Sequence, residues 1–288
     1  MRRVALVVAT FAFIAAVACA PASSTQPAGS SSSFSGSGTP VPDCSPDALH
    51  LVTPGTLTVA TDNPAFPPWI IGNKPDNGKG YEGALAYEIA KRLGFEPSQV
   101  RWIIVPFNSS YAPGSKDFDF DINNISITPE REKAVTFSDS YYELPQGLLV
   151  LKGSPLQDAT TVAELKDGIY GAQIGTTSLH FINTVLLPTT PASVYDTTND
   201  AKAALRNGDV QGLILDLPTA YFEANFNTPN GYLVGQFEPV DNLGLLFEKG
   251  NPLVTCVNQA LAQIKADGTL QDLQDRWLAD YQKVPVIT

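Results

Sequence analysis

From residue 55 onward, strand-like and helix-like segments alternate along the chain, and this alternation constrains the fold more than any other sequence feature. The stretch LTVATD at 57–62 alternates apolar with polar or small residues, which is typical of a strand. The segment after it places Leu85, Ile89 and Leu93 on one face of a helix. Short connections between alternating elements predict the α/β class, with mostly parallel sheets flanked by helices.

The same alternation continues to the C-terminus and falls into two runs. Residues 102–107 and 118–127 are predicted strands, and the pattern then repeats with the strand GIYGAQIG, the helix TTSLHFINTVLL, the helix NDAKAALRN and the strand VQGLILD. Runs of roughly 100 residues each predict two lobes and not one sheet. The chain ends with two helices whose apolar stripes predict core positions: Leu253, Val257, Leu261 and Ile264, then Leu270, Leu273, Trp277 and Tyr281.

The N-terminal residues predict export. Arg2 and Arg3 precede an apolar run that ends at Ala18, which is too short to span a bilayer and is typical of a secretory signal peptide over 1–18. Residues 19–43 are rich in Ser, Gly and Pro and cannot bury enough apolar surface to fold, so they predict a flexible tether.

The segment Ala16-Val17-Ala18-Cys19 resembles the lipobox of bacterial lipoproteins, in which the cysteine is acylated. The resemblance implies a lipid on Cys19 that anchors the protein to the outer face of the cytoplasmic membrane. The alternative is an ordinary secreted protein cleaved nearby. If Cys19 carries lipid, Cys44 and Cys256 remain as an even pair in an oxidising compartment, and we predict a disulfide between them, with two free buried thiols as the alternative.

Composition excludes one class of partner. The chain carries a formal charge of −11 with only 18 Lys and Arg. Nucleic-acid binding needs a basic stripe, which is absent from this sequence, so no nucleic-acid partner is expected.

Arg131 lies where a helix start disfavours it. In Ser126-Ile127-Thr128-Pro129-Glu130-Arg131 a predicted strand runs into a helix capped by Thr128, and the positive partial charge of a helix N-terminus favours acids over arginine. Such a position suits an anion, and a carboxylate can accept two parallel hydrogen bonds from the guanidinium, with Ser126 nearby. The alternative is an exposed Arg131 paired with Glu130 or Glu132.

Two further strand ends carry candidate binding residues, because ligands of open α/β sheets bind outside the carboxyl ends of strands. Thr176 and Thr177 follow the strand GIYGAQIG, although a helix cap would choose the same residues. Asp216 ends the apolar strand GLIL, where it either needs a cationic partner or caps the next helix. Together with Arg131, these residues provide a cation, hydrogen-bond donors and a carboxylate. We therefore predict a ligand that carries both a negative and a positive charge, a zwitterion.

Aromatic residues after the first two strands would supply the pocket walls: Phe66, Trp69, Phe107 and Tyr111. Trp69 suits a core position equally well.

Six segments resemble, in order and spacing, the polar-amino-acid class of bacterial extracellular solute-binding proteins that serve ATP-driven importers. They are LTVATDNPAFPPW, GYEGALAYEIAKRLG, ISITPEREKAVTFSDSYY, IGTTS, LRNGDVQGLILD and NPLVTCVNQALAQIKADGTLQDLQDRWL, and the match covers about residues 55–283. The resemblance implies a two-lobed periplasmic-binding-protein fold joined by two hinge crossings, near 149–153 and 240–244. Lobe 1 would comprise 44–150 and 242–288, and lobe 2 would comprise 151–241.

The resemblance also implies roles for residues. Arg131 would clamp the α-carboxylate of an amino acid with Thr176 and Thr177. Asp216 would take the α-ammonium with Ser126 or Asn124. Phe66 would cover the ligand and Phe107 would face it. Glu82, which stands where the family more often has Asp, and Trp69 are also expected to contact the ligand. Acids near the aromatic walls favour a basic or polar ligand side chain without naming the amino acid.

We therefore expect a monomeric amino-acid receptor that binds the permease subunits of an importer. The receptor is expected to need no cofactor and no metal. Two alternatives remain: a periplasmic dehydratase of the same fold, and a ligand-sensing module for a separate receptor. Catalysis would need a positioned acid or base, and the two histidines, His50 and His180, fall just after the tether and inside a helical pattern. The prediction is therefore a binding protein and not an enzyme.

Overall fold

The computed structural model describes residues 43–288, apart from the side chains of Pro239 and Gln282. The predicted signal peptide, Cys19 and nearly all of the tether lie outside this range. No helix among the described residues is long and apolar enough to cross a membrane.

The first of two five-stranded sheets has the order β2-β1-β3-β10-β4. Its strands are β1 (Leu57–Thr61), β2 (Val100–Ile104), β3 (Phe120–Asp121), β4 (Val135–Phe137) and β10 (Leu246–Glu248). β1 is parallel to β2 and β3, whereas β10 is antiparallel to β3 and β4. The sheet is therefore mixed. Parallel neighbours need a crossover connection, whereas β10 enters the sheet from a distant part of the chain and runs antiparallel to its neighbours.

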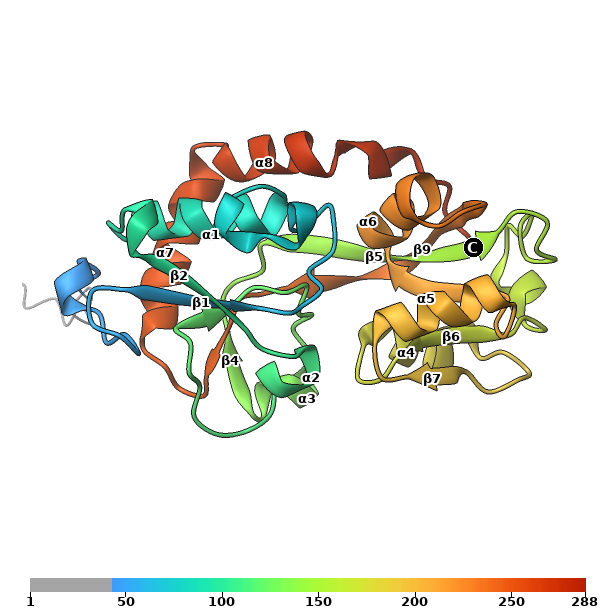
Figure 1. The fold of residues 1–288 in the computed structure, drawn as a ribbon, viewed down its shortest axis with the longest axis horizontal. Coiled ribbons are helices and arrows are strands. Elements are labelled where there is room, and N and C mark those ends of the chain that lie inside the picture. Colours follow the sequence, from blue (N-terminus) through green and yellow to red (C-terminus); the bar gives the residue numbers. More distant parts are fainter. Residues whose placement is uncertain (1–42) are drawn as a thin grey trace, which may run out of the picture. The chain divides into compact units, whose positions relative to one another are not determined.

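The second sheet has the order β7-β6-β8-β5-β9 and is also mixed. Its strands are β5 (Tyr142–Leu151), β6 (Tyr170–Gln173), β7 (Ser193–Tyr195), β8 (Gly212–Asp216) and β9 (Gly231–Leu243). The long strands β5 and β9 pair from Tyr142↔Leu243 to Leu151↔Gly231 and pass from the first sheet's elements to those of the second (Figure 1). The chain therefore crosses twice between two lobes, as predicted.

Helices cover both sheets (Figure 1). The helices are α1 (Tyr81–Arg92), α2 (Phe107–Ser110), α3 (Pro129–Glu132), α4 (Thr177–Phe181), α5 (Thr198–Asn207), α6 (Leu217–Phe222), α7 (Leu253–Ala266) and α8 (Thr269–Trp277). Short 3-10 turns span Pro46–Ala48, Ile71–Asn73, Pro75–Asn77, Pro97–Gln99, Val162–Leu165 and Ala279–Lys283, and π-turns span Ile182–Leu186 and Glu223–Asn227. The stripes predicted on α1 and α7 are buried in one core cluster with the first sheet.

Two predicted strands end earlier than expected, each for a local reason. The strand predicted at 102–107 stops at Ile104, and Phe107 begins α2 directly after Pro106. The strand predicted at 118–127 is continuous only at Phe120–Asp121, and beyond it only an isolated bridge joins Ser126 to Leu243. Asn124 adopts a left-handed backbone with φ +50° that breaks an extended strand. The helix predicted at 176–187 is present as α4 and the π-turn after it, and it ends at Leu187 as predicted, where φ is +46°.

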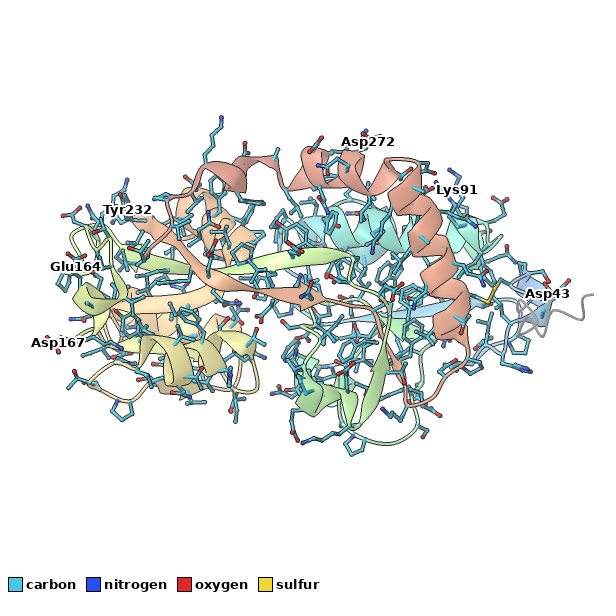
Figure 2. The ribbon with its side chains drawn as sticks, turned by 180° about the vertical axis from the view of Figure 1, so that it is seen from behind. Asp43, Lys91, Glu164, Asp167, Tyr232 and Asp272 are labelled. Carbon is cyan, nitrogen blue, oxygen red and sulfur yellow. A yellow bond between two sulfur atoms is a disulfide. The ribbon has the colours of Figure 1, made fainter. Side chains whose placement is uncertain are left out.

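A disulfide joins Cys44 to Cys256 of α7, as predicted, with an S–S distance of 2.02 Å and a sequence separation of 212. The yellow bond in Figure 2 marks it beside Asp43. It ties the start of the described chain to the first lobe.

Candidate functional site

Arg131 lies at the end of the short helix α3, where Thr128 caps the helix by accepting the backbone N–H of Arg131 at 3.2 Å. Its side chain is buried, with 7% of the residue exposed. Nη1 donates to the carbonyl of Ser126 at 2.7 Å, and Nη2 donates to the carbonyl of Gly175 in the other lobe at 3.0 Å. Two of the five guanidinium N–H groups are thus held by backbone carbonyls.

The alternative of an exposed Arg131 paired with a neighbouring acid is wrong. Glu130 forms its ion pair with Lys133. The guanidinium carbon instead lies 5.3 Å from the ring centre of Phe107 and 4.8 Å from that of Tyr111. Burial lowers the pKa of Arg131, while Tyr111 and nearby acids raise it. The guanidinium remains a cation at all physiological pH values.

Gly175 lets the two lobes approach each other closely at this point. It has φ +76°, and a Cβ there would fall 2.3 Å from the Tyr111 hydroxyl and 2.7 Å from Asn108 Oδ1. Only glycine fits both constraints, and its carbonyl is the acceptor for Arg131.

Asp216 ends β8 opposite this cation. It occupies the N-cap position of α6, yet its side chain accepts no capping hydrogen bond, so capping does not explain the residue. Gln146 Nε2 donates to Asp216 at 3.3 Å and to Asp241 at 3.4 Å. Burial, and then the charge of Asp241, raise the pKa of Asp216 to about 7. A bound cation would offset both effects.

Thr176, Thr177 and Ser126 line the meeting surface of the lobes. Thr176 caps α4, because its Oγ1 accepts the N–H of Leu179 at 3.1 Å, and it donates to the carbonyl of Gln173 at 2.7 Å. The hydroxyls of Thr177 and Ser126 are 3.3 Å apart across the lobes. Thr176 therefore has the capping role that the sequence also allowed, and it lines the cavity as well.

The other predicted residues divide between the cavity and the core. Phe66, Phe107 and Asn124 line the cavity. Trp69 does not; it is 1% exposed and its Nε1 donates to Thr219 Oγ1 at 2.9 Å. Glu82 is also 1% exposed and accepts the N–H of Asn124 at 2.7 Å and the hydroxyl of Tyr141. Trp69 and Glu82 thus lie behind residues of the cavity wall.

The cavity has a volume of about 80 Å³ and receives residues from both lobes. Its lining comprises Asp62, Pro64, Phe66, Phe107, Asn123, Asn124, Ser126, Arg131, Gln173, Thr176, Thr177, Ser178, Thr198, Ile214, Leu215, Asp216 and Thr219. A guanidinium and carboxylates face one small space whose walls include two aromatic rings. This arrangement can hold a compact molecule that carries both charges.

Sequence reasoning missed Gln146 and Asp241. Gln146 is 2% exposed on β5 and connects α4 to the acids, because its Oε1 accepts the hydroxyl of Ser178 at 2.6 Å. Gln146 is a single amide beside the apolar residues of β5, and this pattern could have marked it as a candidate site residue. Asp241 lies in the long strand β9, and no pattern around it marked a site.

The two histidines lie outside this cavity. His50 and His180 are exposed, and His180 lines a second, larger hollow that Arg131 also lines. No group of three or more His, Cys, Asp or Glu side chains placed to hold a metal ion occurs between residues 43 and 288.

Two lobes that meet over a small cavity with a buried cation and opposing acids define a solute-binding protein. The chain belongs to the bacterial extracellular solute-binding proteins, family 3, whose family model matches residues 57–280.

Relatives and solved structures agree with this assignment. The L-cystine-binding protein TcyJ of Escherichia coli (strain K12) is 29% identical over 235 residues, which are 80% of this chain and 85% of that protein. An ancestral arginine-binding protein bound to arginine is 31% identical with a TM-score of 0.65, covering 78% of this chain and 98% of the other. The ancestral amino acid-binding protein AncCDT-1, a precursor of cyclohexadienyl dehydratase, is 29% identical with a TM-score of 0.64, covering 77% and 95%.

Proposed function

We propose that this protein binds a free α-amino acid between its lobes and delivers it to the membrane subunits of an ATP-driven (ABC) importer. The observation that carries the proposal is Arg131, a buried cation that lines a cavity together with Asp216. Relatives with amino-acid ligands in their names support the same ligand class.

The α-carboxylate would bind Arg131. Two of its N–H groups are fixed on backbone carbonyls, so the guanidinium is oriented before ligand arrives and loses little entropy on binding. The hydroxyls of Ser126 and Thr177 lie across the lobes from each other and would donate to the same carboxylate.

The α-ammonium would bind Asp216, with Asn124 close by. Asp216 and Asp241 share one donor, Gln146 Nε2, and repel each other when both are ionised. An ammonium group at Asp216 would relieve that repulsion and restore the usual acidity of the carboxyl. The ring of Phe66 would cover the ligand.

Closure of the lobes would couple binding to transport. Ligand contacts from Arg131 in one lobe and Asp216 in the other exist together only when the lobes are closed, so ligand shifts the population toward that form. We propose lobe 1 as 44–150 with 242–288 and lobe 2 as 151–241. The strand β5, whose pairing in the second sheet begins at Tyr142, would form one of the two crossings between them. The importer would recognise the closed form.

We also propose that the protein works as a monomer outside the cytoplasmic membrane, held there by lipid on Cys19. Release of a Cys19→Ala protein from membranes would support the anchor, and unchanged retention would refute it. We propose further that the bound amino acid is not altered.

The proposal is tested by a thermal-shift screen of refolded, ligand-free protein against the twenty common amino acids. A ligand at 100 times its dissociation constant should stabilise the fold by ~2.7 kcal/mol, which raises Tm by about 5–10 °C. Arg131→Ala and Asp216→Ala should each abolish the shift, and mass spectrometry should recover the ligand unchanged. No shift with any amino acid would overturn the proposal, and conversion of the ligand would favour the dehydratase alternative.

A further inference from the structure

Six polar residues line the cavity besides those that would hold the α-amino and α-carboxyl groups. Ser178 and Thr219 already bond Gln146 and Trp69, respectively. Four remain to be considered: Asp62, Asn123, Gln173 and Thr198. They come from the ends of three strands and the start of a helix. Asp62 follows β1 and Asn123 follows β3, and the parallel register Ala60↔Asp121, continued by two residues, places them level with each other. Gln173 ends β6 in the opposite lobe.

The orientation of the Gln173 amide is fixed by its neighbours. Its Oε1 accepts the backbone N–H of Thr198 at 2.8 Å and the hydroxyl of Thr198 at 2.8 Å. A backbone N–H can only donate, so the oxygen of the amide must face Thr198 and the Nε2 group must face away. Among the described residues Nε2 has no acceptor, and Gln173 therefore presents a donor to the cavity.

Asn123 carries an unsatisfied amide in the same wall. The residue is 9% exposed, and its Nδ2 is buried without a hydrogen-bond partner in the described structure. The Nδ2 of its neighbour Asn124 is likewise buried and unpaired. Buried amides without partners are costly, by about 1–3 kcal/mol each, so their retention points to a ligand that completes their hydrogen bonds.

Asp62 supplies the opposite chemistry. Its Oδ1 accepts the backbone N–H of Asn63 at 2.6 Å, and the carboxylate keeps further acceptor capacity toward the cavity that it lines. The side-chain end of the cavity thus offers an obligatory acceptor from one lobe, an obligatory donor from the other, and the unpaired Nδ2 donor of Asn123.

Given the proposed function, on which this step rests, we infer that the ligand is an amino acid with a neutral side-chain carboxamide or ureido group, of the glutamine, asparagine or citrulline type. Such a group donates N–H to Asp62 and accepts from Gln173 Nε2 through its carbonyl. Asn123 Nδ2 donates to the second lone pair of the same carbonyl.

The other side-chain classes each leave a mismatch. A ligand with a carboxylate side chain would be repelled by the negative charge of Asp62. An ammonium or guanidinium satisfies Asp62 but sets N–H groups against the Nε2 donor of Gln173. An apolar side chain leaves the asparagine amides unpaired, and sites built for hydrogen bonds reject such analogues strongly.

The test is calorimetric titration of the refolded protein with closely matched ligands: glutamine, asparagine and citrulline against glutamate, arginine, lysine and methionine. The inference predicts that one of the first three binds at least about tenfold more tightly than every member of the second set. Tightest binding of a basic, acidic or apolar amino acid would overturn the inference and leave the proposed function intact. If no amino acid binds, the proposed function itself fails.

Two nearly isosteric variants assign the roles. Gln173→Glu keeps an acceptor for Thr198 but replaces the cavity donor by an acceptor, so the preference should move from carboxamides toward arginine or lysine. Asp62→Asn should narrow the gap between glutamine and glutamate. Gln263→Glu on the exposed side of α7 is the matched control and should change neither preference. If Gln173→Glu leaves the ranking of ligands unchanged, Gln173 does not select the side chain and the inference is wrong.

Discussion

From the burial of Glu82 we predict how the stability of the protein depends on pH. The side chain is 1% exposed, and burial raises its pKa from 4.5 to about 8 although Tyr141 and the backbone of Asn124 donate to it. Replacing Glu82 by glutamine keeps an acceptor for both donors and removes the titration. The variant should therefore lose a pH dependence that the wild-type protein shows.

The sign follows from proton counting. Below pH 4.5 Glu82 is protonated in both the folded and the unfolded chain, and its contribution to stability is fully present. Between pH 4.5 and about 8 the unfolded chain ionises while the folded chain keeps the proton, so the free energy of unfolding falls as pH rises. The fall is about 1.4 kcal/mol per pH unit, or about 5 kcal/mol over the whole window.

Three other buried acids act in the same direction, and burial raises the pKa of one of them, Asp119, above its usual value. Burial raises the pKa of Asp121 and of Asp216 to about 7. From pH 7 to 8, Glu82 should thus account for most of the remaining slope, which makes this interval the clearest place to compare the proteins.

The assay is urea unfolding at a series of pH values for wild type, Glu82→Gln and the control Glu143→Gln, whose side chain is exposed on β5. As pH rises, the free energy of unfolding of wild type and control should fall in parallel. The free energy of unfolding of Glu82→Gln should fall less, so that this variant is the most stable of the three proteins at pH 8. Parallel curves for all three proteins would refute the reasoning, because Glu82 would then be ionised in the folded state.

Two further predictions concern stability. Replacing Cys44 and Cys256 by serine opens a loop with a sequence separation of 212, and chain entropy predicts a loss of about 5 kcal/mol in urea unfolding; an unchanged midpoint would contradict it. Lys202 is 6% exposed, donates to Glu223 at 2.7 Å and lies 4.7 Å from the ring centre of Phe66 in the other lobe. Lys202→Met should cost about 3–5 kcal/mol by leaving Glu223 buried without its cation, and Lys202→Met/Glu223→Gln should recover most of that loss. Equal losses in the single and double variants would show that the ion pair does not account for the effect.

Several features could be predicted because they depend on local pattern. The stripes Leu85, Ile89, Leu93 and Leu253, Val257, Leu261 needed only helical spacing, and they are buried as expected. Arg131 could be singled out because it contradicts the preference of a helix start, and a residue that contradicts local preference needs a tertiary reason.

Other features depend on contacts between distant segments. Sequence could not separate Trp69 from Phe66, since both follow β1, and only packing turns one toward Thr219 and the other toward the cavity. The link from Gln146 to Asp241 joins residues 95 positions apart. The left-handed backbone of Asn124, which shortens the strand after β3, is permitted by its amino-acid type but not required by it.

The central claim is that Arg131 and Asp216 together recognise the two charges of a free amino acid. The most direct measurement is calorimetric titration of wild-type protein with its best amino acid, with the α-carboxamide of that amino acid, and with its N-acetyl derivative. Losing either charged contact should cost about 2–5 kcal/mol, so each derivative should bind about 30-fold more weakly or worse. Binding of either derivative as tightly as the parent amino acid would contradict the account.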